Sequence, residues 1–69
     1  METTSTTKSY RAVIVYEDGK FGYSYNAVRG TFAEAEADRD RLAAEPFYKT
    51  LDYKVEFAIE VTTTTTEIL

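Results

Sequence analysis

The fold is decided by residues 9–28, SYRAVIVYEDGKFGYSYNAV, which predict a single β-hairpin. Its two halves, residues 9–17 and 20–28, are rich in the β-branched and aromatic side chains that favour strands. Between them, Asp18-Gly19 is typical of a two-residue type I′ turn. With that turn, Glu17 lies opposite Lys20, and one face collects the apolar pairs Tyr16/Phe21, Ile14/Tyr23, Ala12/Tyr25 and Tyr10/Ala27. A shift of one residue would scatter these pairs over both faces, so we predict this register.

A helix is predicted after the hairpin, over residues 31–45. Thr31 and Glu34 have the spacing of a capping box, in which both side chains satisfy backbone donors at the start of a helix. Pro46 ends the helix because it has no N–H to donate. Helical periodicity predicts that the stripe facing the sheet contains Phe32, Ala35, Arg39, Leu42 and Ala43. We expect the stem of Arg39 to pack on tyrosine rings of the sheet.

The last strand is predicted over residues 51–61, where apolar and polar side chains alternate without interruption. The order of elements is therefore strand, strand, helix, strand. A right-handed crossover through the helix brings the third strand beside the first, in the sheet order 2-1-3. We therefore expect an α+β fold: a ββαβ two-layer sandwich whose three-stranded antiparallel sheet carries one helix on one face.

Threonine-rich segments at residues 1–8 and 62–69 flank this core, and the chain is predicted to be one domain over residues 1–69. If the first and third strands are antiparallel neighbours, the two segments leave the sheet at the same end. They then have two possible fates. Chain termini usually fray, but facing threonines can also pair across strands and extend both of them as a ribbon.

The composition excludes most catalytic chemistry. The chain has no cysteine, histidine or tryptophan, so disulfides, common zinc sites, haem and iron–sulfur ligation are ruled out. No nucleophile can be paired with a histidine base, and the three glycines form no phosphate-binding loop. The helix carries carboxylates four residues apart, which is close enough to share a hard cation, but the same pattern is typical of a solvated acidic face. We expect no enzymatic activity and no cofactor.

The location of the protein is predicted to be cytoplasmic. Residues 1–8 contain no apolar segment of the kind found in signal peptides. The longest uninterrupted apolar run, residues 12–16, is far shorter than a membrane span. We therefore expect no membrane partner.

Two surfaces are candidates for binding a partner. The sheet face turned away from the helix has no further element to cover it, and it is predicted to present Arg11, Val13, Val15, Ser24, Val28, Lys54, Glu56 and Ala58. The helix is predicted to present an acidic face with Glu34, Asp38, Arg41 and Glu45. A domain of this size buries little surface, and long strand edges invite pairing. We therefore expect a homo-oligomer, most simply a dimer.

The net charge of −4 disfavours nucleic acid as a partner, because phosphate contacts require basic residues. We therefore predict a small protein-interaction module with a protein partner. The alternative is a nucleic-acid-binding β-sheet module that uses hairpin aromatics together with Lys8, Arg11, Lys20 and Arg29. An aromatic pocket for a small ligand at an oligomer interface is a third alternative, which no motif supports.

In size and composition the chain resembles the small, acidic, cysteine-free proteins encoded by bacteriophages and other mobile elements. Many of those proteins block or redirect a host protein, so the resemblance implies an accessory or inhibitory role. It is carried by no motif and assigns a role to no residue.

Overall fold

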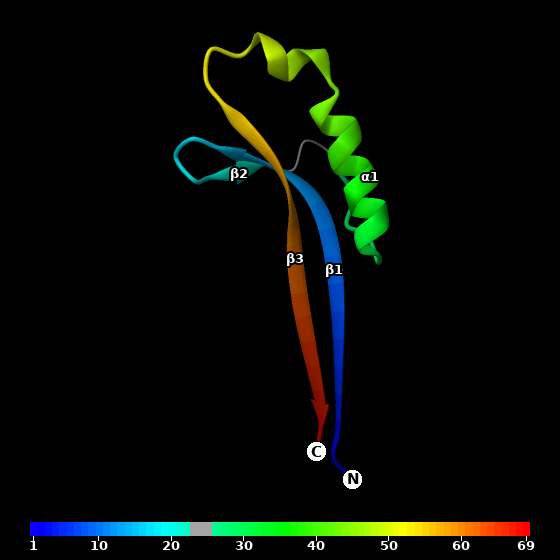
Figure 1. Cartoon of the computed structure of the whole chain (residues 1–69). Coiled ribbons are helices and arrows are strands. Elements are labelled where there is room, and N and C mark those ends of the chain that lie inside the picture. Colours follow the sequence, from blue (N-terminus) through cyan, green and yellow to red (C-terminus); the bar gives the residue numbers. More distant parts are fainter. Residues whose placement is uncertain (23–25) are drawn as a thin grey trace.

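The computed structural model describes residues 1–22 and 26–69. The elements are β1 (Thr3–Tyr16), β2 (Phe21–Gly22), α1 (Phe32–Ala43), the 3₁₀ helix η1 (Pro46–Thr50) and β3 (Val55–Ile68). The strands form one antiparallel sheet in the order β2-β1-β3, and α1 packs against it (Figure 1). The predicted α+β fold and its sheet order are confirmed.

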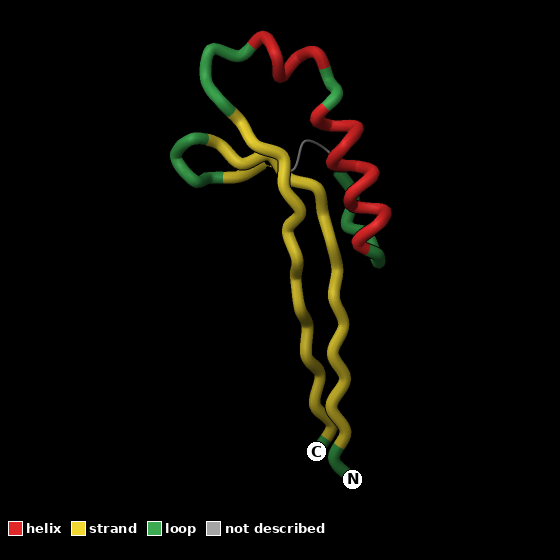
Figure 2. The backbone as a smooth tube through the Cα atoms, viewed as in Figure 1, coloured by secondary structure: helices red, strands yellow, loops and turns green. Residues whose placement is uncertain are grey.

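β1 and β3 form a long two-stranded ladder that runs far beyond the helix. Its register begins with Tyr16 opposite Val55 and continues without a break to Thr3 opposite Ile68. We call residues 3–9 together with residues 62–68 the ribbon. It projects as a narrow arm, with both chain ends at its tip (Figure 2). Of the two fates considered for the threonine segments, the structure has the paired one, because threonine is β-branched and favours facing strand positions.

The ribbon gives the molecule an elongated shape. Its principal extents are 56 × 24 × 14 Å and its radius of gyration is 15.5 Å, whereas a compact chain of this length would have a radius near 11 Å. The last strand is predicted at residues 51–61. In the structure it begins later, at Val55, and continues to Ile68.

The hairpin turn differs from the prediction by one residue. The N–H of Gly19 donates to the carbonyl of Tyr16 (2.9 Å), and the N–H of Tyr16 donates to the carbonyl of Lys20 (2.8 Å). Gly19 has φ of 83°, so the connection is a three-residue loop that ends in a left-handed glycine. The side chain of Asp18 accepts from the N–H of Lys20 at 3.0 Å, which favours this loop over the type I′ turn.

The register of the hairpin shifts accordingly. Val15 lies opposite Phe21 and Ile14 opposite Gly22, so the predicted Tyr16/Phe21 pair is wrong. Further along, Tyr10 pairs with Arg29 rather than with Ala27. The predicted partner of Ile14, Tyr23, is also wrong, since Ile14 lies opposite Gly22. The predicted partner of Ala12, Tyr25, lies outside the described residues.

The core is small and is formed by residues of β1 and α1. Its buried apolar side chains are Ala12, Val13, Ile14, Ala35 and Leu42. The N-terminus of α1 is capped by Thr31, whose hydroxyl oxygen accepts from the N–H of Glu34 (3.3 Å) and whose O–H donates to the Glu34 carboxylate (2.8 Å). Thr31 is therefore confirmed as the N-cap, whereas the Glu34 carboxylate bonds to the Thr31 hydroxyl and not to a backbone N–H as the capping box predicted. The helix ends at Ala43, shortly before Pro46.

The buried stripe of α1 is rotated from the predicted one and consists of Ala35, Asp38 and Leu42. Phe32 is 47% exposed, and its ring makes an edge-to-face contact with Tyr10 of the sheet. Arg39 does not lie in this stripe, since its guanidinium pairs with Glu36 and Asp40 on the surface of the helix. The rotation brings Asp38, a charged residue predicted to lie on the solvent-exposed face, into the buried stripe.

Candidate interaction surface

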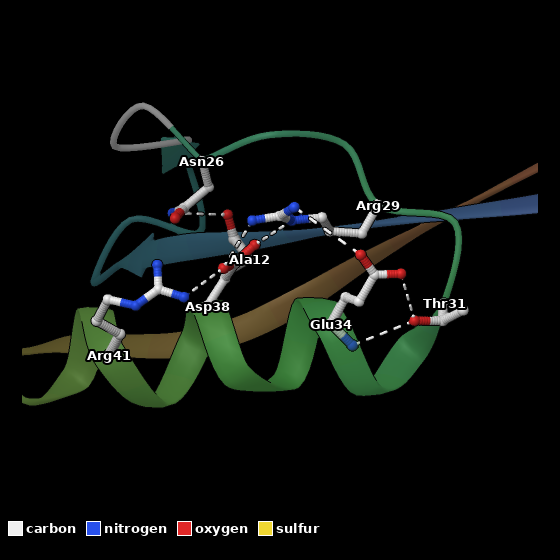
Figure 3. Close-up of polar contacts among 7 residues, drawn as sticks. All are labelled: Ala12, Asn26, Arg29, Thr31, Glu34, Asp38 and Arg41. Atoms are coloured by element: carbon white, nitrogen blue, oxygen red, sulfur yellow. Dashed lines mark hydrogen bonds and ion pairs between the residues drawn. The ribbon is translucent and has the colours of Figure 1, made fainter.

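Asp38 is the centre of an ion-pair cluster between α1 and the segment that precedes it (Figure 3). Its side chain is only 3% exposed. The Nε of Arg29 donates to Oδ2 at 2.7 Å, and the Nη2 of Arg29 donates to Oδ1 at 3.2 Å. Arg41, one turn further along the helix, donates from Nη2 to Oδ1 at 2.8 Å. Both carboxylate oxygens are thus occupied by guanidinium donors.

The electrostatics of this cluster keep it ionised. The hydrogen bond from Arg29, aided by the positive charges of Arg29 and Arg41, lowers the pKa of Asp38 although burial acts in the opposite direction. The hydrogen bond to Asp38 and its negative charge raise the pKa of Arg29, with a smaller contribution from Glu34. Glu34 lies 3.9 Å from the Arg29 guanidinium. Two positive and two negative charges therefore balance, and the cluster fastens the helix to the sheet.

This arrangement corrects the predicted acidic helix face. Glu34 and Glu45 are exposed as expected. Asp38, by contrast, is withdrawn from solvent, and Arg41 is paired with it. The sequence signal that identifies Asp38 is its spacing, because positions 35, 38 and 42 form a regular helical stripe. Arg29 just before the helix and Arg41 one turn later provide the charges that make its burial tolerable.

The predicted partner surface on the second sheet face is only partly open. Val13, at its centre, is 4% exposed, so the expectation of an uncovered face is wrong there. The other members differ in exposure: Arg11, Val15 and Ala58 are half-buried, Val28, Lys54 and Glu56 are exposed, and Ser24 lies outside the described residues.

Three of these residues meet beside the hairpin turn. Val15, Lys54 and Glu56 line a shallow hollow of about 360 Å³ together with Tyr16, Glu17 and Gly19. Its wall is fixed by a hydrogen bond from the N–H of Lys54 to the Glu17 carboxylate at 2.9 Å. The hollow is open and carries charges of both signs, which makes it a shallow feature of the surface rather than an enclosed ligand pocket.

The ribbon is a larger exposed feature. Long strand edges are expected to invite pairing, but the threonine segments are not predicted from the sequence to form a binding surface. All of its residues except the half-buried Ser9 are exposed. One face consists of hydroxyl side chains and Ile68: Thr3, Ser5, Thr7 and Ser9 on β1, with Thr62, Thr64, Thr66 and Ile68 on β3. Thr4, Thr6, Lys8, Thr63, Thr65 and Glu67 lie on the other face.

The direction of the backbone groups on the ribbon follows from the bonds of Tyr10. Its N–H and carbonyl both bond to Arg29, on the β2 side of β1. Because bonding directions alternate along a strand, even-numbered residues of β1 point to that side and odd-numbered ones point to β3. Through the continuous register, even-numbered residues of β3 bond to β1, and odd-numbered ones point outward.

Two strand edges are therefore unpaired within the described part of the chain. Among residues 1–22 and 26–69, β1 is the strand that pairs with β3, and no strand pairs with the opposite edge of β3 between Val55 and Ile68. The outer edge of β1 is free over residues 3–9, below the bridge between Tyr10 and Arg29. Such edges present rows of N–H and C=O groups to any chain that can pair with them.

Comparison with protein-family models, with curated proteins and with solved structures finds no match. In residues 1–22 and 26–69, no helix is long and apolar enough to cross a membrane. The same residues contain no group of three acidic, histidine or cysteine side chains that could hold a metal ion.

Proposed function

We propose that this protein is a small, non-enzymatic protein-interaction module that binds its partners by strand addition to the ribbon. The observation that carries the proposal is the pair of free edges on β3 and the outer part of β1. In strand addition, backbone hydrogen bonds supply affinity, and side chains on alternating positions supply selectivity.

The position of the ribbon supports this role. A two-stranded ribbon is only marginally stable in water by itself, since it has no packed face. Nearly all residues of this one are exposed, and Phe32 of α1 contacts Tyr10, which lies next to its inner end. Pairing with another strand would add hydrogen bonds and side-chain contacts where the chain supplies few of its own.

The role we propose is that of an accessory protein or inhibitor that attaches to another protein in the cytoplasm. The alternative, nucleic-acid binding, has less support from the arrangement of basic residues. Arg29 forms ion pairs with Asp38 and Glu34, and Arg11 is half-buried. Lys8 and Lys20 remain exposed, but they are few against a net charge of −4.

Affinity capture with edge-blocked variants tests this function. The immobilised wild-type protein, a Thr6→Pro/Thr63→Pro variant and a Thr6→Ala/Thr63→Ala control are each exposed to lysate of the source cells. Proline removes outward N–H groups at both edges while leaving the bonds within the ribbon intact. Alanine keeps these N–H groups and changes only the side chains.

A protein captured by the wild type and the alanine control, but lost with the proline variant, supports strand addition. Equal capture by all three proteins contradicts it. Retention of the wild type on a single-stranded DNA column at physiological salt would favour the nucleic-acid alternative instead.

A further inference from the structure

We infer that the partner of the β3 edge is a second copy of this chain, which pairs antiparallel with it about a two-fold axis at Val61. This inference rests on the proposed function, because it names one partner for the strand edge that the function uses. Two three-stranded sheets would thereby join into one continuous sheet, with β3 of each copy at its middle. An interface of this kind is isologous, so each copy contributes the same residues.

The backbone of β3 is oriented for this pairing. The odd-numbered residues from Val55 to Glu67 point their N–H and C=O groups outward. With Val61 opposite its own copy, residue 59 faces 63, residue 57 faces 65 and residue 55 faces 67. These pairs exchange about 14 backbone hydrogen bonds, which is within the range of about 10 ± 5 for typical protein interfaces.

The side chains favour an axis at Val61 over one at Glu60. Val61 is 50% exposed although it lies opposite Tyr10, whose ring contacts the half-exposed Phe32. In the proposed register the two Val61 side chains meet. The apolar group formed by Val61, Tyr10 and Phe32 in one copy is thereby joined to the same group in the other. An axis at Glu60 would instead place two carboxylates opposite each other, which is unfavourable. The Val61 register faces Glu56, Glu60 and Glu67 with Thr66, Thr62 and Val55.

The accessible surface that this chain exposes in excess of a compact monomer is similar to the area that one partner buries in a dimer. The accessible surface is 5249 Å², whereas a compact monomer of this mass would expose about 4,400 Å². The surplus of about 850 Å² is close to the roughly 800 Å² that each partner buries in a standard interface. The extra surface of the elongated chain is thus about equal to one side of a stable dimer contact.

The edge of β1 is a weaker candidate for the same role. It is free only over residues 3–9, where Thr4, Thr6 and Lys8 point outward. Pairing of two such edges would give about six hydrogen bonds. The remainder of β1 is already bonded to β2 and Arg29. The longer β3 edge therefore offers the larger interface.

Single-cysteine variants test both the dimer and its register, since the natural chain contains no cysteine. Val61→Cys, Thr63→Cys and Thr6→Cys are compared under mild oxidation with oxidised glutathione on non-reducing gels. In the proposed dimer the two Val61 Cα atoms lie about 5.5 Å apart, which suits a disulfide. The two copies of residue 63 lie about 14 Å apart along the strands, which does not.

We expect a covalent dimer with Val61→Cys only, and a mass twice that of the chain for the wild type in light scattering. Thr63→Pro is expected to remain monomeric, whereas Thr63→Ala is expected to dimerise. Cross-linking at Thr63 or Thr6 instead of Val61 overturns the register, and a monomeric wild type at millimolar concentration overturns the dimer. A monomer that still captures another protein through its edges would refute this inference and leave the proposed function standing.

Discussion

Proline substitutions at Thr63 and Thr64 are expected to have different effects on the ribbon, although the two residues are neighbours in β3. The N–H of Thr64 points toward Thr7 across the ribbon, and that of Thr63 points to the open edge. Proline removes the N–H in both cases. Only Thr64→Pro therefore removes a bond within the chain.

The magnitude follows from the position of Thr64. A lost backbone hydrogen bond costs about 1 kcal/mol net, which corresponds to about a fivefold change in an equilibrium constant. No core packing offsets this loss, because residues 3–8 and 62–68 are exposed. The pairs beyond it, Ser5 with Thr66 and Thr3 with Ile68, should therefore open about five times more often, or more if the ring also distorts β3.

Amide hydrogen exchange measured by NMR checks this expectation, at a concentration where the protein is monomeric. The amides of Thr66 and Ile68 should exchange at least about fivefold faster in Thr64→Pro and should be little changed in Thr63→Pro. The core amide of Ile14 serves as the internal control and should be unaffected by either change. Equal acceleration by both prolines would refute the assignment of inward and outward backbone groups on β3.

Three further predictions concern the turn, the ion cluster and the dimer. Gly19→Ala should destabilise the fold by about 1–2 kcal/mol in urea unfolding, because φ of 83° strains any residue with a Cβ. Gly30→Ala is the control: a Cβ added at Gly30 contacts no other atom and φ is not positive there, so no comparable loss is expected. Asp38→Asn should lower the melting temperature at neutral pH far more than Asp40→Asn does. Since the pKa of Asp38 is lowered by folding, its stabilising effect is present above the unfolded pKa near 3.9 and is lost as the pH falls through the folded value. The difference between wild type and Asp38→Asn should therefore shrink below about pH 4, and a constant difference would contradict the linkage. Finally, the amide of Val61 should become protected from exchange as protein concentration rises; protection independent of concentration would argue against pairing at that edge.

The order of elements could be predicted from sequence because it depends on local patterns. Apolar alternation predicts a strand over residues 51–61, of which residues 55–61 belong to β3. Capping by Thr31 and the glycine turn after Tyr16 likewise each predict one kind of local structure. Short connections and a single helix then leave one reasonable sheet order. These features act over a few residues, so no knowledge of packing is needed to recognise them.

The features that were not predicted are those for which the sequence allows two local structures of nearly equal free energy. Asp18-Gly19 is compatible with two hairpin loops, and the side-chain bond of Asp18 to Lys20 is associated with the longer one. Asp38 is a charged residue whose burial becomes acceptable only when Arg29 and Arg41 reach it together. The threonine ribbon has no apolar alternation, so only its long-range pairing distinguishes it from a frayed tail.

The meeting of both chain ends at the tip of the ribbon has a consequence for how this chain can be rearranged. Thr3 lies opposite Ile68, so a turn of about two to five residues could join the ends and close the ribbon into a hairpin. The chain could then be opened elsewhere, for example in the exposed connection between η1 and β3, without changing any neighbour in the sheet. Such a circular permutant would carry the hydroxyl-rich arm as a continuous loop, with its new ends at the opposite pole of the molecule.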